Sequence, residues 1–322
     1  MKILVTGCAG FIGFHLSKHL LEENNNVIGV DNINNYYDPN LKEKRLNILK
    51  KNKKFKFYKL DICNEDKIIK VFKKRIDCVI NLAAQAGVRY SLENPDAYFQ
   101  SNLRGFYNIL INSKRFKIKH LIFASTSSVY GNQKLMPIDE NSDITNPIQF
   151  YAATKTSNEL MASSFSQLYQ MKISALRFFT VYGPWGRPDM ALFKFTNNIL
   201  RKKQIDIYNF GKHKRDFTYI DDCVNAIKLI IHAKKKRKKF EVFNIANGKS
   251  EKLEKYIKII EKELKLKAKK KYLPLQKGDI QTTSANINKI KKFVNYRPSV
   301  NIETGIRKFI EWYKFYYYKN GK

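Results

Sequence analysis

Tyr151 and Lys155 stand four positions apart in a segment whose apolar spacing predicts a helix over residues 150–170. Residues at i and i+4 share one face of a helix, so the two side chains point the same way. A lysine charge there can lower the pKa of a phenol, and the phenolate can take a proton from a substrate hydroxyl while hydride leaves the same carbon. The same spacing also occurs on ordinary amphipathic helices, where both residues would face solvent.

A run of four hydroxyl residues, Ser125–Ser128, follows a predicted buried strand at His120–Ser125. Ligands of open parallel sheets bind outside the carboxyl ends of the strands, which is where this run would lie. We therefore interpret Tyr151 and Lys155 as catalytic residues with hydroxyl groups beside them.

Three glycines, Gly7, Gly10 and Gly13, form a G-x-x-G-x-x-G pattern between a predicted strand, Lys2–Thr6, and a helix predicted over residues 11–23. In that context the pattern predicts a dinucleotide site. The first glycine permits a tight turn, the second lets backbone amides approach a pyrophosphate at the helix N-terminus, and the third allows close helix–strand packing.

Acidic and small residues at the ends of the next strands favour NAD as the dinucleotide. Asp31 ends the second predicted strand, where an acid meets the ribose hydroxyls of NAD and repels the 2′-phosphate of NADP. The glycine-rich turn itself contains no Arg or Lys. Candidate NAD-binding residues are Gly7, Gly10, Phe11, Ile12, Gly13, Asp31, Asn32, Asp61, Ile62, Leu82, Ala83, Ala84, Tyr151 and Lys155.

The first half of the 322-residue chain alternates apolar strands with amphipathic helices, and this alternation weakens from about Gly183. We predict an α/β fold, a Rossmann-type doubly wound parallel sheet with a smaller C-terminal α/β substrate domain. Residues 1–182 would hold NAD and the catalytic pair, and residues 183–322 the substrate, with interleaved segments. Strands are predicted at Lys2–Thr6, Asn26–Asp31, Phe55–Leu60, Asp77–Leu82, His120–Ser125, Lys172–Phe179, Ile205–Tyr208, Arg215–Tyr219 and Glu241–Ala246, the last three in the smaller domain.

The formal net charge of +33 raises the alternative of nucleic-acid binding. The lysines are spread along the chain, however, and the densest run, Lys234–Lys239, falls between a predicted helix and a predicted strand, where a solvated loop is expected. We expect no nucleic-acid partner, although a positive field helps to collect an anionic substrate.

No stretch approaches the roughly 20 apolar residues of a membrane-spanning helix. The four cysteines form no C-x-x-C pair and have no histidine at ligand spacing, so we expect no metal site. The first strand enters the glycine-rich turn and does not resemble a signal peptide. A cytoplasmic protein without a membrane partner is expected.

With these residues in place, the chain resembles, nearly end to end, the nucleotide-sugar epimerases of the extended short-chain dehydrogenase/reductase superfamily. It is most similar to the bacterial UDP-glucuronate 4-epimerases. Residues 125–131 and 215–222 are typical of the superfamily, whereas residues 81–91 and 177–191 resemble the uronate enzymes. The resemblance implies NAD-dependent 4-epimerisation of UDP-glucuronate to UDP-galacturonate through a 4-keto intermediate.

The resemblance also assigns roles. Thr126 would be the third catalytic residue and bond the sugar 4-oxygen beside Tyr151, and Asn102 would steady the cofactor-binding site from a neighbouring helix. Alternatives remain for four of these residues. Asn102 could be an ordinary polar helix residue, Arg187 and Arg215 could form surface ion pairs, and Asp279 could be a turn residue. Candidate substrate-binding residues are Arg89, Ser127, Ser128 and Thr180 (the sugar pocket for the three hydroxyls), Arg187 and Arg215 (the diphosphate) and Asp279 (the uridine ribose).

Ser127 and Ser128 also bear on the reaction. In related 4,6-dehydratases these two positions resemble Asp-Glu, the acid and base of water elimination, and the decarboxylases resemble the Glu type at the second position. Hydroxyls there disfavour elimination. A UDP-glucose or UDP-N-acetylglucosamine 4-epimerase and a non-enzymatic NAD(H)-binding regulator remain alternatives.

In related proteins, the helices predicted here over residues 97–114 and 150–170 pair with their copies into a four-helix interface. A homodimer is therefore expected. The apolar residues of both helices suit either this interface or packing on the sheet: Phe106, Ile109, Leu110, Leu160, Met161, Phe165 and Leu168.

Overall fold

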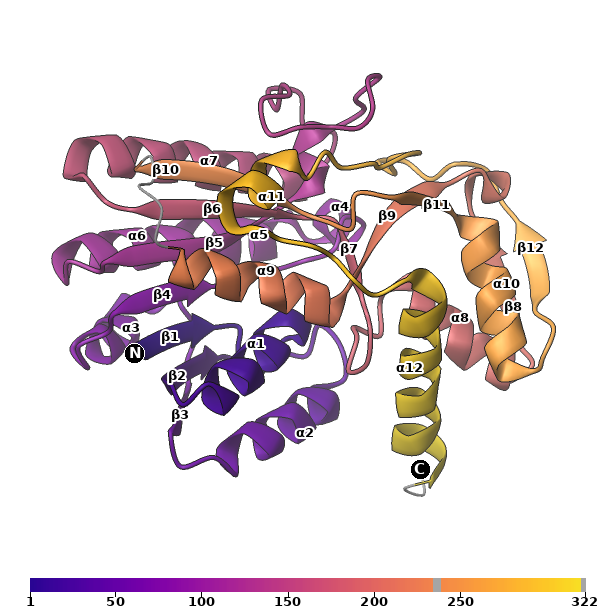
Figure 1. The fold of residues 1–322 in the computed structure, drawn as a ribbon, viewed down its shortest axis with the longest axis horizontal. Helices are drawn as coiled ribbons and strands as arrows, with labels where there is room; N and C mark the ends of the chain where they lie inside the picture. Colours follow the sequence, from indigo (N-terminus) through magenta and orange to yellow (C-terminus); the bar gives the residue numbers. More distant parts are fainter. Residues whose placement is uncertain (234–238, 320–322) are drawn as a thin grey trace.

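The computed structural model describes residues 1–233 and 239–319 and is built on a seven-stranded parallel sheet (Figure 1). The strand order is β10-β6-β5-β4-β1-β2-β3. The chain therefore starts in the middle and winds outward in both directions, the doubly wound Rossmann arrangement predicted from the sequence. The strands are β1 (Lys2–Thr6), β2 (Asn26–Asp31), β3 (Phe55–Lys59), β4 (Cys78–Asn81), β5 (His120–Thr126), β6 (Ile173–Phe178) and β10 (Phe240–Ile245).

Helices cover both faces of this sheet because its strands are apolar on both sides. Side chains alternate along β1, so Ile3 and Val5 enter one hydrophobic core and Leu4 enters the other. The first core lies under α1 (Phe11–Glu22), α2 (Pro39–Lys50) and α9 (Ile220–His232). The second lies under α3 (Glu65–Phe72), α6 (Gly105–Arg115) and α7 (Phe150–Tyr169).

A smaller part packs beside the carboxyl ends of the sheet strands (Figure 1). It holds a three-stranded sheet in the order β11-β9-β7 and a parallel pair, β12-β8. Its elements are β7 (Thr180–Tyr182), α8 (Ala191–Leu200), β8 (Gln204–Ile207), η3 (Asn209–Gly211), β9 (Lys214–Tyr219), β11 (Ser250–Lys252), α10 (Leu253–Leu264), β12 (Lys269–Tyr272), α12 (Ile302–Lys314) and η4 (Phe315–Lys319). The short helix α11 (Asn288–Val294) packs instead on β10 of the main sheet.

One strand expected in the smaller domain is not there. The segment predicted at Glu241–Ala246 forms β10 and pairs in parallel with β6, so it is the edge strand of the main sheet. Phe243 and Ile245 are fully buried in the first core. An apolar run predicts a strand but not the sheet that it joins, because pairing partners are set by long-range packing. The chain therefore crosses between the two parts more than once.

The helix predicted over residues 97–114 is interrupted. The chain forms α4 (Tyr90–Glu93), α5 (Pro95–Tyr98), a π-helical segment η1 (Phe99–Arg104) and only then α6. Phe106, Ile109 and Leu110 are at most 1% exposed and pack on the sheet. The interface interpretation of these three residues is therefore wrong, and packing on the sheet, the alternative, applies to them.

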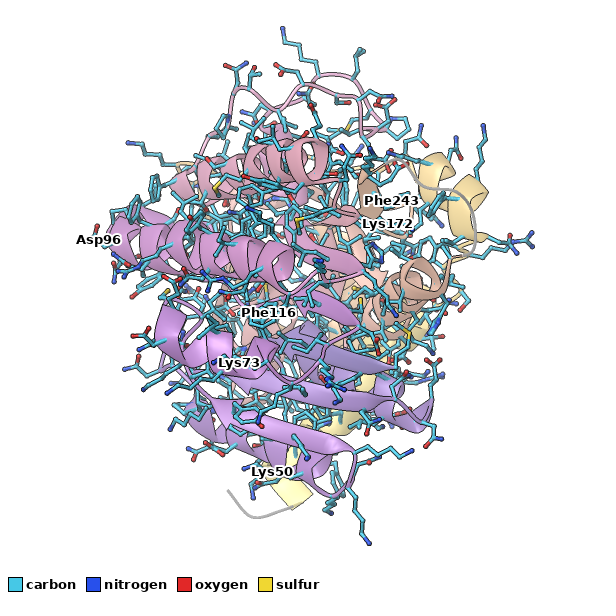
Figure 2. All side chains as sticks on the ribbon, turned by 90° about the vertical axis from the view of Figure 1, so that its left-hand side faces the viewer. Lys50, Lys73, Asp96, Phe116, Lys172 and Phe243 are labelled. Atoms are coloured by element: carbon cyan, nitrogen blue, oxygen red, sulfur yellow. The ribbon has the colours of Figure 1, made fainter. Side chains whose placement is uncertain are left out.

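Exposed lysines come from many parts of the chain. Figure 2 labels Lys50, Lys73 and Lys172, which come from different parts of the chain and are all exposed. Most of the basic run at Lys234–Lys239 lies outside the described residues, and Lys239 alone of it is described. Within the described ranges, no helix is long and apolar enough to cross a membrane.

Candidate active site

A single cavity of about 700 Å³ extends from the glycine-rich turn, past the carboxyl ends of the sheet strands, to β8 and β9 of the smaller part. It collects residues that lie far apart in the sequence. With one exception, Asn102, every residue predicted for the site lines this cavity: Gly7, Gly10, Phe11, Ile12, Gly13, Asp31, Asn32, Asp61, Ile62, Leu82, Ala83, Ala84, Arg89, Thr126, Ser127, Ser128, Tyr151, Lys155, Thr180, Arg187, Arg215 and Asp279.

The glycine-rich turn leaves room that side chains would fill. A Cβ atom on Gly13 would lie 2.1 Å from the carbonyl oxygen of Gly7, and Gly7 itself has φ +69°. Gly10 caps α1 without any side-chain hydrogen bond to the first amides of the helix. These amides and the helix dipole suit the pyrophosphate of a dinucleotide, so the residues present fit NAD.

Two carboxylates define the far end of the cofactor region. Asp31 is 9% exposed and accepts hydrogen bonds from the backbone amides of Ala9 (3.0 Å) and Ile33 (2.9 Å). Burial raises the pKa of Asp31, and these bonds oppose the rise. Burial would also raise the pKa of Asp61, but hydrogen bonds from Cys63 and Asn32 hold it below its ordinary value.

The catalytic candidates meet where β5 ends and α7 begins. Tyr151 and Lys155 are one turn apart on α7, and the Thr126 hydroxyl at the end of β5 is hydrogen-bonded to Tyr151. Lys155 is 3% exposed, and its Nζ donates to the carbonyl oxygen of Ala124 (3.0 Å). This bond fixes the ammonium group beside the strand end.

Burial controls the charges of this pair. It lowers the pKa of Lys155 to about 8, and Glu159 opposes that shift. It raises the pKa of Tyr151, while the Thr126 hydroxyl and the charge of Arg187 oppose the rise. Tyr151 is therefore a neutral phenol at pH 7, and proton transfer from it or to it needs a bound reaction partner.

Behind the pair lies a buried ion pair that the sequence interpretation missed. Arg177 on β6 donates to both oxygens of Glu159 on α7, at 3.0 and 2.7 Å, and both side chains are at most 4% exposed. The Ser125 hydroxyl donates to Glu159 at 2.5 Å. Ser125 is thus committed to the structure, and three hydroxyls, from Thr126, Ser127 and Ser128, remain toward the cavity. Glu159 follows Lys155 by four positions, a spacing that could have suggested it.

Asn102 does not line the cavity but lies beside it, in η1. Its amide side chain exchanges hydrogen bonds with the backbone of Gln85, at 2.9 and 3.1 Å, and donates to the Thr154 hydroxyl at 3.0 Å. The π-helical segment η1 directs it there. Asn102 therefore fastens the loop after β4 to α7, and the loop forms the cavity wall.

The substrate end of the cavity is lined by charges that already have partners. Arg187 forms a two-point ion pair with Asp189 at 3.0 and 2.5 Å. Arg187 therefore both lines the cavity, as predicted, and forms the ion pair that was considered as an alternative. Arg89 lies 3.4 Å from Asp279. Arg215 donates to the carbonyl oxygens of Gln281 (2.8 Å) and Ile280, and burial lowers its pKa to about 10.

Sequence reasoning missed several cavity residues on the loop after β2 and on the following helix α2. The Tyr36 hydroxyl donates to Asp189 at 3.2 Å, and Lys42 donates to Asn34 at 2.6 Å. Burial lowers the pKa of Lys42 to about 8. Their signal was position alone, because segments that follow a strand at its carboxyl end tend to meet the ligand.

Residues 3–246 match the model of the NAD dependent epimerase/dehydratase family. These residues include the glycine-rich turn, Tyr151, Lys155 and the strands of the main sheet. The chain belongs to this family, whose enzymes work with NAD.

Individual relatives narrow the comparison. The chain is 44% identical over 313 residues to UDP-glucuronate 4-epimerase of Thermodesulfobacterium geofontis, covering 97% of this chain and 95% of the relative. UDP-glucuronic acid 4-epimerase from Bacillus cereus, crystallised with UDP-glucuronic acid and NAD, is similar in structure, with a TM-score of 0.93, 34% identity and coverage of 98% and 100%. UDP-glucose 4-epimerase from Thermotoga maritima, crystallised with UDP-glucose, is also similar in structure. Its TM-score is 0.89, its sequence identity is 32%, and the match covers 98% of this chain and 99% of that chain. Similar structures thus include enzymes for a uronate and for a neutral sugar.

Proposed function

We propose that this protein interconverts UDP-glucuronate and UDP-galacturonate by NAD-dependent epimerisation at C4 of the sugar. One observation carries the proposal: a half-buried Tyr151 and a buried Lys155 open onto three hydroxyl side chains of residues 126–128 in the same cavity as the glycine cradle. The relatives named above support it, since they share the uronate substrate at 44% and 34% identity.

Tyr151 is the acid–base group of the mechanism. Once its own proton has left to solvent, the phenolate oxygen of Tyr151 takes the proton of the sugar 4-hydroxyl, and the Thr126 hydroxyl, bonded to Tyr151, holds the 4-oxygen in reach. Lys155, held by the Ala124 carbonyl, supplies a positive charge that favours the phenolate during the transfer. When bound, NAD supplies the acceptor and then the donor of the C4 hydride.

Formation of the opposite epimer needs room for the sugar to turn, and it needs the cofactor to stay bound. The 4-keto sugar must turn about its link to the diphosphate before Tyr151 gives the proton back. A cavity of about 700 Å³ leaves room for that turn. The glycine cradle must hold the dinucleotide throughout, because each cycle consumes and regenerates it.

A uronate makes one further demand, because its 4-keto form is a β-keto acid that can lose carbon dioxide. Ser127, Ser128 and Thr180 line the cavity and can donate hydrogen bonds to the sugar carboxylate, which are stronger than bonds to a neutral hydroxyl. Holding the carboxylate away from the alignment needed for C–C cleavage would protect it. Hydroxyls at positions 127 and 128 also leave no carboxylate there to repel the uronate or to start elimination.

Proton NMR of purified protein with UDP-glucuronate tests the proposal. The 4-epimeric uronate should grow in without UDP-pentose, and denaturation of the protein should release NAD or NADH. Appreciable UDP-pentose would make the protein a decarboxylase. Faster turnover of UDP-glucose or UDP-N-acetylglucosamine in the same assay would assign a neutral sugar, and no turnover of any of them would favour an NAD(H)-binding regulator.

We also propose a homodimer in the cytosol, where soluble nucleotide sugars and NAD are available. Five large apolar side chains on η1, α6 and α7 are 43% to 70% exposed, and exposed apolar surface on a monomer often marks an interface. The chain has a mass of 37.8 kDa, and light scattering at micromolar concentration should give twice that mass. The exposed residues are Phe99, Tyr107, Leu160, Leu168 and Tyr169.

A further inference from the structure

Three consecutive carbonyl groups, those of Pro184, Trp185 and Gly186, bond to side chains from the cofactor side of the molecule. The Nε2 atom of His15 on α1 lies 2.9 Å from the Pro184 oxygen, and since a carbonyl can only accept, Nε2 carries the hydrogen. Arg45 on α2 donates through Nη2 to the oxygens of Trp185 (2.5 Å) and Gly186 (3.3 Å). Two helices of the Rossmann part therefore hold the loop that leads into the smaller part.

The same arginine also holds the glycine-rich turn. Nη1 of Arg45 donates to the carbonyl oxygen of Ala9 at 2.8 Å, while the amide of Ala9 donates to Asp31 at 3.0 Å. Arg45 is fully buried and, among the described residues, forms no direct ion pair with a carboxylate, although its charge favours the ionised form of Asp31. A buried cation without a directly bonded carboxylate is costly for folding, so stability alone gives little reason for an arginine at this place.

The loop held by Arg45 is strained. Trp185 has φ +58°, in the left-handed region that a bulky residue rarely adopts. Its ring packs against Phe14 of α1 on one side and against Trp312 of α12 on the other, with ring centroids 5.5 and 5.3 Å away. A strained conformation persists only when its surroundings determine it, so the loop depends on contacts from both parts.

Arg187 follows this loop directly and lines the substrate end of the cavity. We propose that Arg45, assisted by His15, is a positioning residue that couples the cofactor site to the diphosphate end of the substrate site. Bound dinucleotide fixes the turn at Ala9, Arg45 passes that constraint to residues 185 and 186, and the backbone of Arg187 is set for a nucleoside diphosphate. The proposal rests on the proposed function for the identity of the two ligands.

Coupling of this kind is reciprocal, so a nucleoside diphosphate must also tighten the cofactor. The experiment measures the rate of NAD release from the holoenzyme, with and without saturating UDP, by enzymatic trapping of the released NAD. UDP should slow release by a factor on the order of 10 in the natural protein, within the range usual for coupled sites. In Arg45→Met, release without UDP should be faster and the UDP factor should fall toward 1. Simple blocking of the exit by UDP is the same in both proteins and cancels in the comparison.

Further variants separate coupling from loss of stability. Arg45→Lys keeps the charge, but a single ammonium group cannot bond to Ala9 and to residues 185 and 186 at the same time, so this variant should lose most of the UDP factor. It replaces Arg45→Met if that variant fails to fold. His15→Leu should lose part of the factor, and His15→Gln, whose amide can still donate to Pro184, should restore it. The matched control is Glu261→Gln, which removes a buried carboxylate bonded to Ala268 and Lys270 far along α10 and should lower thermal stability without changing the UDP factor.

An unchanged UDP factor in both Arg45 variants would overturn the proposal, as would equal loss of the factor in the Glu261→Gln control. Neither result depends on turnover, because NAD and UDP are used as binding probes. If the protein binds both ligands but does not epimerise UDP-glucuronate, the proposed function fails while the coupling still stands or falls on these rates.

Discussion

The two ends of the cavity differ in the groups that form them, backbone at one end and side chains at the other. At the cofactor end, backbone groups prepare the site: Gly7, Gly10 and Gly13 leave the space, and the first amides of α1 have no side-chain cap. At the substrate end, side chains prepare it, and they are already paired with one another, as Arg187 is with Asp189. A backbone site keeps its shape when the ligand is absent. A site of paired side chains must exchange its partners when the ligand enters.

This difference suits a catalyst that keeps its cofactor and exchanges its substrate. Pairs at a partly exposed site cost little to break, because solvent screens them, about 0–1 kcal/mol for an exposed pair. The Arg89–Asp279 pair is of this kind, with side chains 46% and 15% exposed. The fully buried Arg177–Glu159 pair behind the catalytic residues is the opposite case, and breaking it would leave an uncompensated charge in the core.

The largest expected effect falls where the two ends meet. Tyr151→Phe keeps the aromatic ring and removes the acid–base group, so turnover should fall by about 10²- to 10⁴-fold. The cofactor end is backbone-built and should not respond. NAD content after denaturation should match that of the natural protein, and steady-state kinetics with UDP-glucuronate should give the loss in kcat. Full activity in the variant would show that another residue moves the proton.

A smaller effect should appear at the hydroxyl residues. Ser128→Glu places a carboxylate beside the proposed uronate carboxylate, and a like-charge contact that costs more than about 1.4 kcal/mol lowers kcat/KM for UDP-glucuronate at least tenfold. UDP-glucose, whose sugar carries no charge, should lose less. Ser128→Ala, which removes the hydroxyl without adding charge, is the control. Equal losses for the two substrates in Ser128→Glu would mean that position 128 does not face the carboxylate.

The contrast between the two ends also explains what the sequence could predict. The glycine spacing, Asp31 and the Tyr151–Lys155 pair act within one turn or one strand–helix unit, so local pattern was enough to find them. The substrate end depends on partners that are distant in sequence. Arg89 and Asp279 lie 190 positions apart, and no local periodicity relates them. Their positions came from the family resemblance, and their pairing came only from the structure.

Arg45 and β10 show the same limit in the fold. Arg45 lies on the buried face of α2 between Leu41 and Leu49. A charged residue on a buried face indicates that it has a partner, but the sequence does not show which residue that is. Its partners at Trp185 and Gly186 are 140 and 141 positions away. The strand β10 was predicted as a strand but in the wrong sheet. The π-helical segment η1 could not be expected either, since helical periodicity does not report a single wide turn.

A buried histidine of the cofactor end gives a prediction for pH. Burial lowers the pKa of His15 to about 3 from its ordinary value of 6.5. Between these values the unfolded chain binds a proton that the folded chain does not, so the unfolding free energy decreases as pH falls from 6.5 toward 3. At pH 5 the loss from His15 is about 2 kcal/mol.

Denaturant unfolding at pH 7 and pH 5 measures this loss. The decrease in unfolding free energy between the two pH values should be about 2 kcal/mol larger in the natural protein than in His15→Gln, which cannot take up a proton. Only the difference between the two proteins is informative, because burial raises the pKa of Asp216 to about 6 and this group acts in the opposite direction in both. Equal decreases would mean that His15 is not held neutral by burial.

The smallest effect should be found at the substrate end, and it separates binding from stability. Asp279→Ala removes the contact with Arg89, and because the Arg89 side chain is 46% exposed the unfolding free energy should change by less than about 1 kcal/mol. If Asp279 accepts a hydrogen bond from the uridine ribose, KM for UDP-glucuronate should rise by about 2- to 12-fold, the value of one ordinary hydrogen bond, with kcat unchanged. Thermal unfolding and steady-state kinetics on one preparation give both values. A fall in stability with an unchanged KM would reverse the comparison, because it would make Asp279 a part of the fold and leave the ribose to other residues of the cavity.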